Sequence, residues 1–341
     1  MQLQTFQLIN GVHIPKICLG TNITLPVVFG ADSFKASLKA FLGYFRALIR
    51  PQDYSTWGKV PTIKATRTLS SIVKEASAYG IFAFDTSRSY GGSERRLAKG
   101  LNGRREDIFI ITKIDDHSQF LGQTEKCLQT SLNQLKTDYV DLLLLHWPVD
   151  YPAFPDERFF DNGIPVYARS WKTLENIYKD GGARAIGVSN FSVRQLETLK
   201  KYAEIMPMAN EFECHPLCIR KELNHYCAEN KIQVLAFSAL RRMDSRLMVG
   251  KITEIANTYN KSVAQVILRW HIQNDRIPIF GTTQKDRLSD YAQIFDFELM
   301  PEELDIIDNY NINYRGSPDS ERCDFTKGIW VGWEDYKDCC P

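Results

Sequence analysis

The sequence lacks several features that would assign it to a familiar class of proteins. No apolar stretch in its 341 residues approaches the roughly 18 residues that a membrane span requires. Residues 1–16 lack a basic segment followed by an apolar one, so they do not resemble a secretory signal. Long runs of Lys or Arg are also missing, and the net charge is only +1. We therefore expect a cytoplasmic protein that binds neither a membrane nor nucleic acid.

The eight cysteines lack the paired spacing that is typical of zinc sites and disulfide frameworks. Cys214 and Cys218 lie near His215 and His225, but this spacing matches no zinc finger or ribbon. We therefore expect reduced thiols and no metal site. A GxGxxG segment after a strand is missing as well, which argues against the open dinucleotide-binding fold.

The pattern that is present alternates short apolar runs with amphipathic segments. Apolar residues make up 44% of the chain, which is enough for a full core. After a hairpin at 6–13, the pattern predicts strands at 16–19, 81–84, 107–112, 140–145, 184–188, 208–212, 233–237 and 276–280. It predicts helices at 65–79, 123–135, 170–178, 192–203, 219–230, 262–274 and 287–295. Eight such units without a second sheet pattern predict an α/β fold, a single (β/α)8 TIM barrel spanning 1–341.

Residues 21–64 are a large insertion in the first strand-to-helix loop of this barrel. They contain a predicted amphipathic helix at 33–49 and lie at the rim where barrels carry their active sites. We predict that the insertion is a lid or an added subdomain, and a surface for a partner protein is the alternative. The aromatic tail at 311–341 is predicted to lie over the barrel mouth.

Polar residues end or follow three successive strands of the predicted barrel. Asp85 and Tyr90 come after one strand, Lys113 ends the next, and His146 ends the one after that. Because active sites lie at the carboxyl ends of barrel strands, we expect these four side chains to meet. Each also has a structural interpretation: Asp85 and Lys113 as an ion pair, His146 as a core histidine, and Tyr90 as a packing residue.

The four residue types together favour the reduction of a carbonyl group. The Lys113 ammonium, balanced by Asp85, should bring the pKa of the Tyr90 phenol closer to neutral, so that Tyr90 can donate a proton to a carbonyl oxygen. His146 would hydrogen-bond to the same oxygen and orient it. This chemistry needs no metal or nucleophile, which points to a hydride from a cofactor.

The chain resembles the aldo-keto reductases through a set of short segments in the family's order. These are FDTSRSYGGSE, ITK, LLLHWP, IGVSNF, NEFECHP, LAFSAL and IPIFGTTQKDRL, and the resemblance covers residues 11–299. It implies an NAD(P)H-dependent, reversible reduction of an aldehyde or ketone, of the alcohol dehydrogenase or carbonyl reductase type. Tyr90 would be the general acid, assisted by Lys113, Asp85 and His146. The alternative is a cofactor-binding regulatory or scaffold protein with little turnover, similar to potassium-channel β subunits.

The same resemblance implies a cofactor site and a substrate site. Cofactor contacts are expected from Gly20, Thr21, Ser189, Asn190, Glu211, Phe237, Ser238, Leu240, Thr282, Thr283 and Arg287. Ser189 and Asn190 would hold the nicotinamide carboxamide, and Phe237 would stack on the ring. NADP(H) is expected over NAD(H), because the Arg287 guanidinium suits a 2′-phosphate. Trp147 is the expected wall of a pocket for a small carbonyl substrate, and we expect a monomer or weak homo-oligomer.

Four residues depart from the family's usual pattern. Gly281 replaces a frequent lysine, Tyr291 a frequent asparagine, Glu211 a frequent glutamine and Phe237 a frequent tyrosine. If Glu211 is ionised, its charge would favour the positively charged oxidised nicotinamide ring over the neutral reduced one, making the bound cofactor a stronger hydride donor. The alternative is that Glu211 merely accepts a hydrogen bond from the carboxamide nitrogen.

Overall fold

Eight parallel strands form a closed barrel in this protein. The structure, a computed structural model, describes residues 3–22, 63–149 and 163–321. The strands are β3 (Cys18–Gly20), β4 (Ala83–Asp85), β5 (Phe109–Ile114), β6 (Leu142–Leu145), β7 (Ile186–Ser189), β8 (Ala209–Glu213), β9 (Gln233–Phe237) and β10 (Arg276–Phe280). Their order around the barrel is β10-β3-β4-β5-β6-β7-β8-β9. The predicted (β/α)8 TIM barrel is therefore confirmed.

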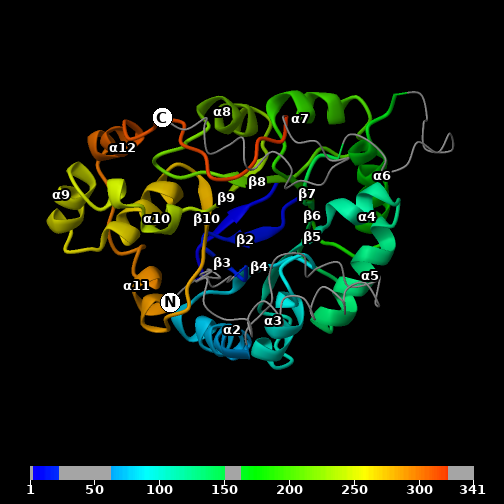
Figure 1. The fold of residues 1–341 in the computed structure, drawn as a ribbon, viewed down its shortest axis with the longest axis horizontal. Helices are drawn as coiled ribbons and strands as arrows, with labels where there is room; N and C mark the ends of the chain where they lie inside the picture. The colour runs from blue at the N-terminus through cyan, green and yellow to red at the C-terminus, as the bar shows by residue number, and fades with distance from the viewer. Residues whose placement is uncertain (1–2, 23–62, 150–162, 322–341) are drawn as a thin grey trace, which may run out of the picture.

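Helices surround the barrel on all sides (Figure 1). They are α2 (Ile63–Ala76), η2 (Ser77–Tyr79), α3 (Ser93–Leu101), α4 (Asp116–Phe120), α5 (Thr124–Leu135), α6 (Val166–Lys179), α7 (Val193–Lys200), α8 (Lys221–Glu229), η4 (Arg241–Met243), η5 (Ser245–Leu247), α9 (Lys251–Thr258), α10 (Val263–Gln273), α11 (Asp286–Ala292) and α12 (Pro301–Asp308). Capping boxes at Ser192 and Ser262 start α7 and α10 where the sequence predicts helix starts. The helices α3, α4, α9 and α12 fall outside the predicted ranges.

Two strand boundaries differ from the predicted ones in a way that matters for the site. Asp85 is the last residue of β4 rather than a residue beyond it, and β5 continues past Lys113 to Ile114. The prediction that Lys113 ends its strand is therefore wrong. The Lys113 side chain is fully buried and bonded to Asp85, so its charge is satisfied inside the barrel and β5 does not have to stop at Lys113.

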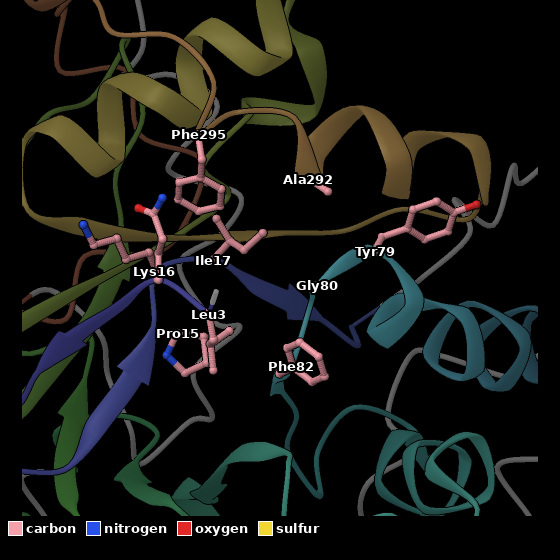
Figure 2. A pocket seen from close by; sticks show the side chains of 10 residues that line it. Leu3, Pro15, Lys16, Ile17, Tyr79, Gly80, Phe82, Ala292 and Phe295 are labelled. Atoms are coloured by element: carbon pink, nitrogen blue, oxygen red, sulfur yellow. The ribbon is translucent and has the colours of Figure 1, made fainter. Parts of the chain in front are cut away.

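The predicted hairpin forms and lies at the amino-terminal end of the barrel. β1 (Thr5–Gln7) and β2 (His13–Pro15) pair antiparallel, and the Asn10 side chain in their turn donates to the Arg184 carbonyl, just before β7, at 2.9 Å. Figure 1 shows the hairpin across the centre of the barrel. Figure 2 shows an apolar hollow beside it, lined by Ile17 and Phe82, which precede β3 and β4. The hollow is thus at the end opposite the carboxyl ends of the strands.

Parts of the predicted rim lie outside the described residues, namely 23–62 of the insertion, 150–162, and 322–341 of the tail. The described part of the C-terminal segment is anchored at the end of β8. There the Glu213 carboxylate accepts backbone N–H groups of Gly316 and Ser317 at 2.9 and 2.6 Å. Farther along, Ser192 donates to Glu321. Among the described helices, none has the length and apolar character to cross a membrane.

A substitution at Gly187 of β7 would test how closely the barrel is packed. A Cβ at this position would lie 2.6 Å from the Ala209 carbonyl oxygen and 2.8 Å from Leu144 Cδ2. Gly187→Ala should therefore lower the free energy of unfolding by about 1–3 kcal/mol in urea denaturation, because neither neighbour can move cheaply. Gly281→Ala is the matched control, since its Cβ would meet no atom within 4 Å. Equal losses in the two variants would contradict this close packing.

Candidate functional site

Three ionisable side chains meet inside the barrel near the carboxyl ends of the strands. Asp85 comes from β4 and Glu211 from β8, strands that are opposite in the order around the barrel, and Lys113 comes from β5. The Lys113 ammonium donates to the Asp85 carboxylate and lies 3.3 Å from Glu211 Oε2. All three residues are at most 3% exposed. The ammonium therefore joins opposite sides of the barrel.

The charges of this trio are set by burial and by one another. Burial is the main reason that the pKa of Glu211 rises to about 8, and the Asp85 charge adds to it. Burial also raises the pKa of Asp85, against the opposing effect of Lys113. For Lys113, burial acts to lower the pKa, but the two carboxylates outweigh it and the net shift is upward. At neutral pH Lys113 is charged and Glu211 largely holds a proton, so the hypothesis of an ionised Glu211 applies only toward pH 8 and above.

Tyr90 and His146 lie beside this trio. The Lys113 Nζ is 5.0 Å from the centre of the Tyr90 ring. The Tyr90 and His146 rings meet edge to face, with 5.7 Å between their centres and 77° between their planes. The structure thus brings together Asp85, Tyr90, Lys113 and His146, as we expected from the strand order.

The pKa of Tyr90 is raised, whereas the sequence predicted a pKa closer to neutral. Burial of the phenol is the largest cause. Lys113 lowers the pKa through its charge and a hydrogen bond, but Asp85 and Glu211 raise it further. The prediction was correct about the effect of Lys113 and wrong about the net direction. Tyr90 therefore keeps its proton throughout the neutral range.

Buried polar side chains lie just after β7 and within β8. Asn190, at a left-handed φ of 64°, donates from Nδ2 to the His146 carbonyl at 3.0 Å and to Ser189 Oγ at 3.1 Å. Its Oδ1 is buried, as is Thr21 Oγ1, and neither atom has a hydrogen-bond partner among the described residues. Glu211 Oε2 is buried too, and the Lys113 ammonium lies 3.3 Å from it. The free Asn190 acceptor, with the Glu211 carboxyl on the adjacent strand, fits the N–H₂ group of a carboxamide, so the residues present suit a nicotinamide ring.

The remaining residues expected at the cofactor lie along the same end of the barrel. Gly20 ends β3, Phe237 ends β9, and Ser238 and Leu240 follow directly. After β10, Thr282 is buried and its hydroxyl donates to the Gln284 carbonyl, while Thr283 is exposed. Arg287 is exposed on α11 and interacts with Tyr291.

Trp147, the expected pocket wall, is 8% exposed and packs with Val149 and Val166. The adjoining loop at 150–162 lies outside the described residues. A role for this indole in a substrate pocket stays a prediction.

Sequence reasoning missed three residues that the structure places in or beside the site. Cys18 of β3 is buried near the trio, and burial together with the two carboxylates raises the pKa of its thiol. Ser87 and Ser89 lie in the loop between Asp85 and Tyr90, and Ser89 reaches His146. The position of both serines within FDTSRSYGGSE was the available signal, but the direction of a loop side chain cannot be read from a sequence.

Comparisons with known proteins agree with this geometry. The profile of the Aldo/keto reductase family matches residues 55–312. A glyoxal reductase of Bacillus subtilis (strain 168) is 40% identical over 253 residues, covering 73% of this chain and 86% of that protein. A methylglyoxal reductase of Escherichia coli (strain K12) is 31% identical over 255 residues, covering 73% and 87%. The crystal structure of a Bombyx mori aldo-keto reductase in complex with NADP has a TM-score of 0.71 at 28% identity, over 98% of this chain and 99% of that one.

The raised pKa of Glu211 predicts how stability changes with pH. The folded-state pKa of about 8 lies above the unfolded value, so the folded protein binds this proton more tightly. The stabilisation of the folded protein that comes from this proton is complete below about pH 4 and is lost as the pH rises through 8. Glu211→Gln removes the ionisation. Wild type should therefore lose this stabilisation from pH 5 to pH 9, and the variant should not. The free energy of unfolding of the variant minus that of wild type should rise by roughly 2–4 kcal/mol over this range.

Chemical denaturation at a series of pH values measures this difference. Glu106→Gln makes the same change at an exposed glutamate and is the control. A pH-independent difference for Glu211→Gln would show that the folded-state pKa of the Glu211 carboxyl is not raised above its unfolded value.

Proposed function

The chain belongs to the aldo/keto reductase family, and on that premise we propose that it reduces an aldehyde or ketone to an alcohol with NADPH. The observation that carries this proposal is the Lys113 ammonium, which bonds to Asp85 and lies beside the Tyr90 ring at a point where His146 also meets that ring. A proton donor and a hydrogen-bonding imidazole are thus next to each other at the barrel mouth. This pairing suits a carbonyl oxygen on which negative charge develops.

In this proposal each residue has a distinct role toward the carbonyl oxygen. Tyr90 donates the proton in reduction and accepts it in the reverse direction. Lys113 stabilises the phenolate that remains, and Asp85 keeps the ammonium in place. His146 orients the oxygen. The bound cofactor supplies the hydride.

The carboxamide of that cofactor would be held by Asn190 Oδ1, a buried acceptor without a partner among the described residues, and by the Glu211 carboxyl on the adjacent strand β8. Thr21 Oγ1 is a further group at the same end. We favour NADP over NAD because Arg287 is an exposed guanidinium on α11, and a guanidinium binds a 2′-phosphate in a bidentate manner. The Bombyx mori relative was crystallised with NADP, which supports the same preference.

Small reactive aldehydes are the first substrates to test. Two relatives that match most of this chain are named as reductases of glyoxal and methylglyoxal. We therefore propose a substrate with a carbonyl next to an aldehyde, whose electron-poor carbon accepts a hydride readily.

Tyr90→Phe tests the proposed proton donor. The variant should lower kcat for methylglyoxal reduction by about 10²–10⁴-fold, because the phenyl ring has no proton to donate. The Kd of NADPH, measured by fluorescence titration, should stay within about twofold of the wild-type value, since Phe keeps the shape of the ring. The assay follows NADPH and NADH oxidation with a panel of aldehydes and ketones.

The same assay distinguishes an enzyme from a cofactor-binding regulatory protein. If wild type binds NADPH tightly and reduces none of the carbonyls, a cofactor-binding regulatory protein is the better interpretation. If Tyr90→Phe retains wild-type turnover, the proton comes from another group.

Glu211→Gln tests whether the trio influences the oxidation state of the bound cofactor. In wild type the ratio of the Kd values for NADPH and NADP⁺ should rise between pH 7 and pH 9, because Glu211 ionises with a pKa of about 8 and its negative charge favours the cationic ring. In Glu211→Gln this ratio should be nearly constant. Fluorescence and calorimetric titrations measure both constants without turnover. The same pH dependence in both proteins would mean that Glu211 only accepts a hydrogen bond.

A further inference from the structure

The loop after β4 carries Tyr90 on a backbone that is fixed mainly at its base. There the hydroxyls of Thr86 and Ser93 bond to each other at 2.7 Å and close the loop. Tyr90 itself is followed by Gly91 and Gly92, which have left-handed φ angles of 58° and 80°. Glycine adopts many backbone conformations at little cost, so these two residues do little to hold the phenol in one place. The position of Tyr90 therefore depends on side-chain contacts from the loop to the rest of the barrel.

Arg88, two residues before Tyr90, makes such a contact. Its Nε lies 3.0 Å from Oδ2 of Asp115, and the two side chains are only 18% and 9% exposed. Asp115 directly follows β5 and is two residues beyond Lys113. The ion pair thus connects the loop that carries the phenol to the strand that carries the ammonium. Because water reaches little of either side chain, this pair is screened less than one on the open surface.

The Asp115 carboxylate is held in place independently of Arg88. As the N-cap residue of α4, it accepts the backbone N–H of Ser118 on Oδ1 at 2.7 Å. The thiol of Cys127 on α5 donates to Oδ2 at 3.4 Å. The carboxylate is therefore a fixed anchor, and the glycine-containing loop is the part that the ion pair holds.

We propose that Arg88 is a positioning residue that sets the place of Tyr90 relative to Lys113. This inference rests on the proposed function, in which the phenol must be close to both the ammonium and the carbonyl oxygen. Lys113 Nζ lies 5.0 Å from the centre of the Tyr90 ring. A misplacement of about 1 Å in such an arrangement can cost about 100-fold in rate. Arg96 also contacts the loop, donating to the Gly91 carbonyl at 2.7 Å, but it belongs to α3 and makes no link to β5 in doing so.

Hydrogen exchange measured by mass spectrometry tests the contact without any assay of turnover. The backbone amides of residues 86–92 should exchange at least about fivefold faster in Arg88→Gln than in wild type. Asp115→Asn should have the same effect, because it removes the charge and keeps an acceptor for the Ser118 N–H. Arg88→Lys retains the charge and should exchange close to the wild-type rate. Arg95→Gln, at an exposed arginine of α3, is the matched control and should not change the exchange of this loop.

A double-mutant cycle separates positioning of the phenol from a general loss of structure. Arg88→Gln should lower the single-turnover rate of methylglyoxal reduction by about 10–100-fold. The Kd of NADPH should stay within about twofold, because Arg88 is not among the expected cofactor contacts. In the Tyr90→Phe background the same substitution should change the residual rate less than about twofold, since no phenol proton remains to be positioned.

Unchanged exchange of residues 86–92 in Arg88→Gln would overturn the proposal. So would an equal fractional loss of rate in the wild-type and Tyr90→Phe backgrounds, because a merely structural effect lowers both alike. If wild type reduces no carbonyl while the loop exchanges faster in Arg88→Gln, the proposed function fails and the role of Arg88 in holding the loop stands.

Discussion

The ammonium of Lys113 sits between two carboxyl groups from opposite sides of the barrel, and the remainder of the site depends on this contact. Without it, Asp85 and Glu211 would be two buried acids facing each other with no cation. Breaking a buried pair in this way typically costs 3–5 kcal/mol, so we expect about that loss from removal of the amine. The same ammonium is the one group of the trio that favours ionisation of Tyr90. The Lys113 Nζ thus both stabilises the fold and favours ionisation of the Tyr90 phenol.

Burial determines which of the side chains around the Lys113 ammonium hold a proton. It raises the pKa of Tyr90, Asp85 and Glu211, and Lys113 opposes it at all three, joined at Asp85 by a hydrogen bond with Glu211. Two carboxyl groups against one ammonium leave one proton to be held by the acids, and Glu211 holds it at neutral pH. A protonated phenol beside a charged lysine is therefore the resting arrangement. Such a phenol is a proton donor, which is the state that carbonyl reduction requires.

Sequence pattern was sufficient for the barrel and for the meeting of Asp85, Lys113 and His146, because apolar runs mark strands and consecutive parallel strands lie side by side. It could not show the contact between Lys113 and Glu211. That contact joins β5 to β8 across the barrel interior, and strand tilt and side-chain reach decide it. The net pKa of Tyr90 was also beyond sequence reasoning, since desolvation depends on every neighbour in the fold. Residues 23–62 of the predicted insertion lie outside the described structure, so the lid stays a prediction.

The most direct test of the central claim is the single-turnover rate of carbonyl reduction by Lys113→Met preloaded with NADPH, measured by stopped flow. Methionine keeps most of the side-chain volume and removes the charge. The variant should bind NADPH but reduce methylglyoxal at least about 100-fold more slowly than wild type, because Tyr90 loses the cation that stabilises its phenolate. A folded Lys113→Met protein with a wild-type rate would contradict the central claim.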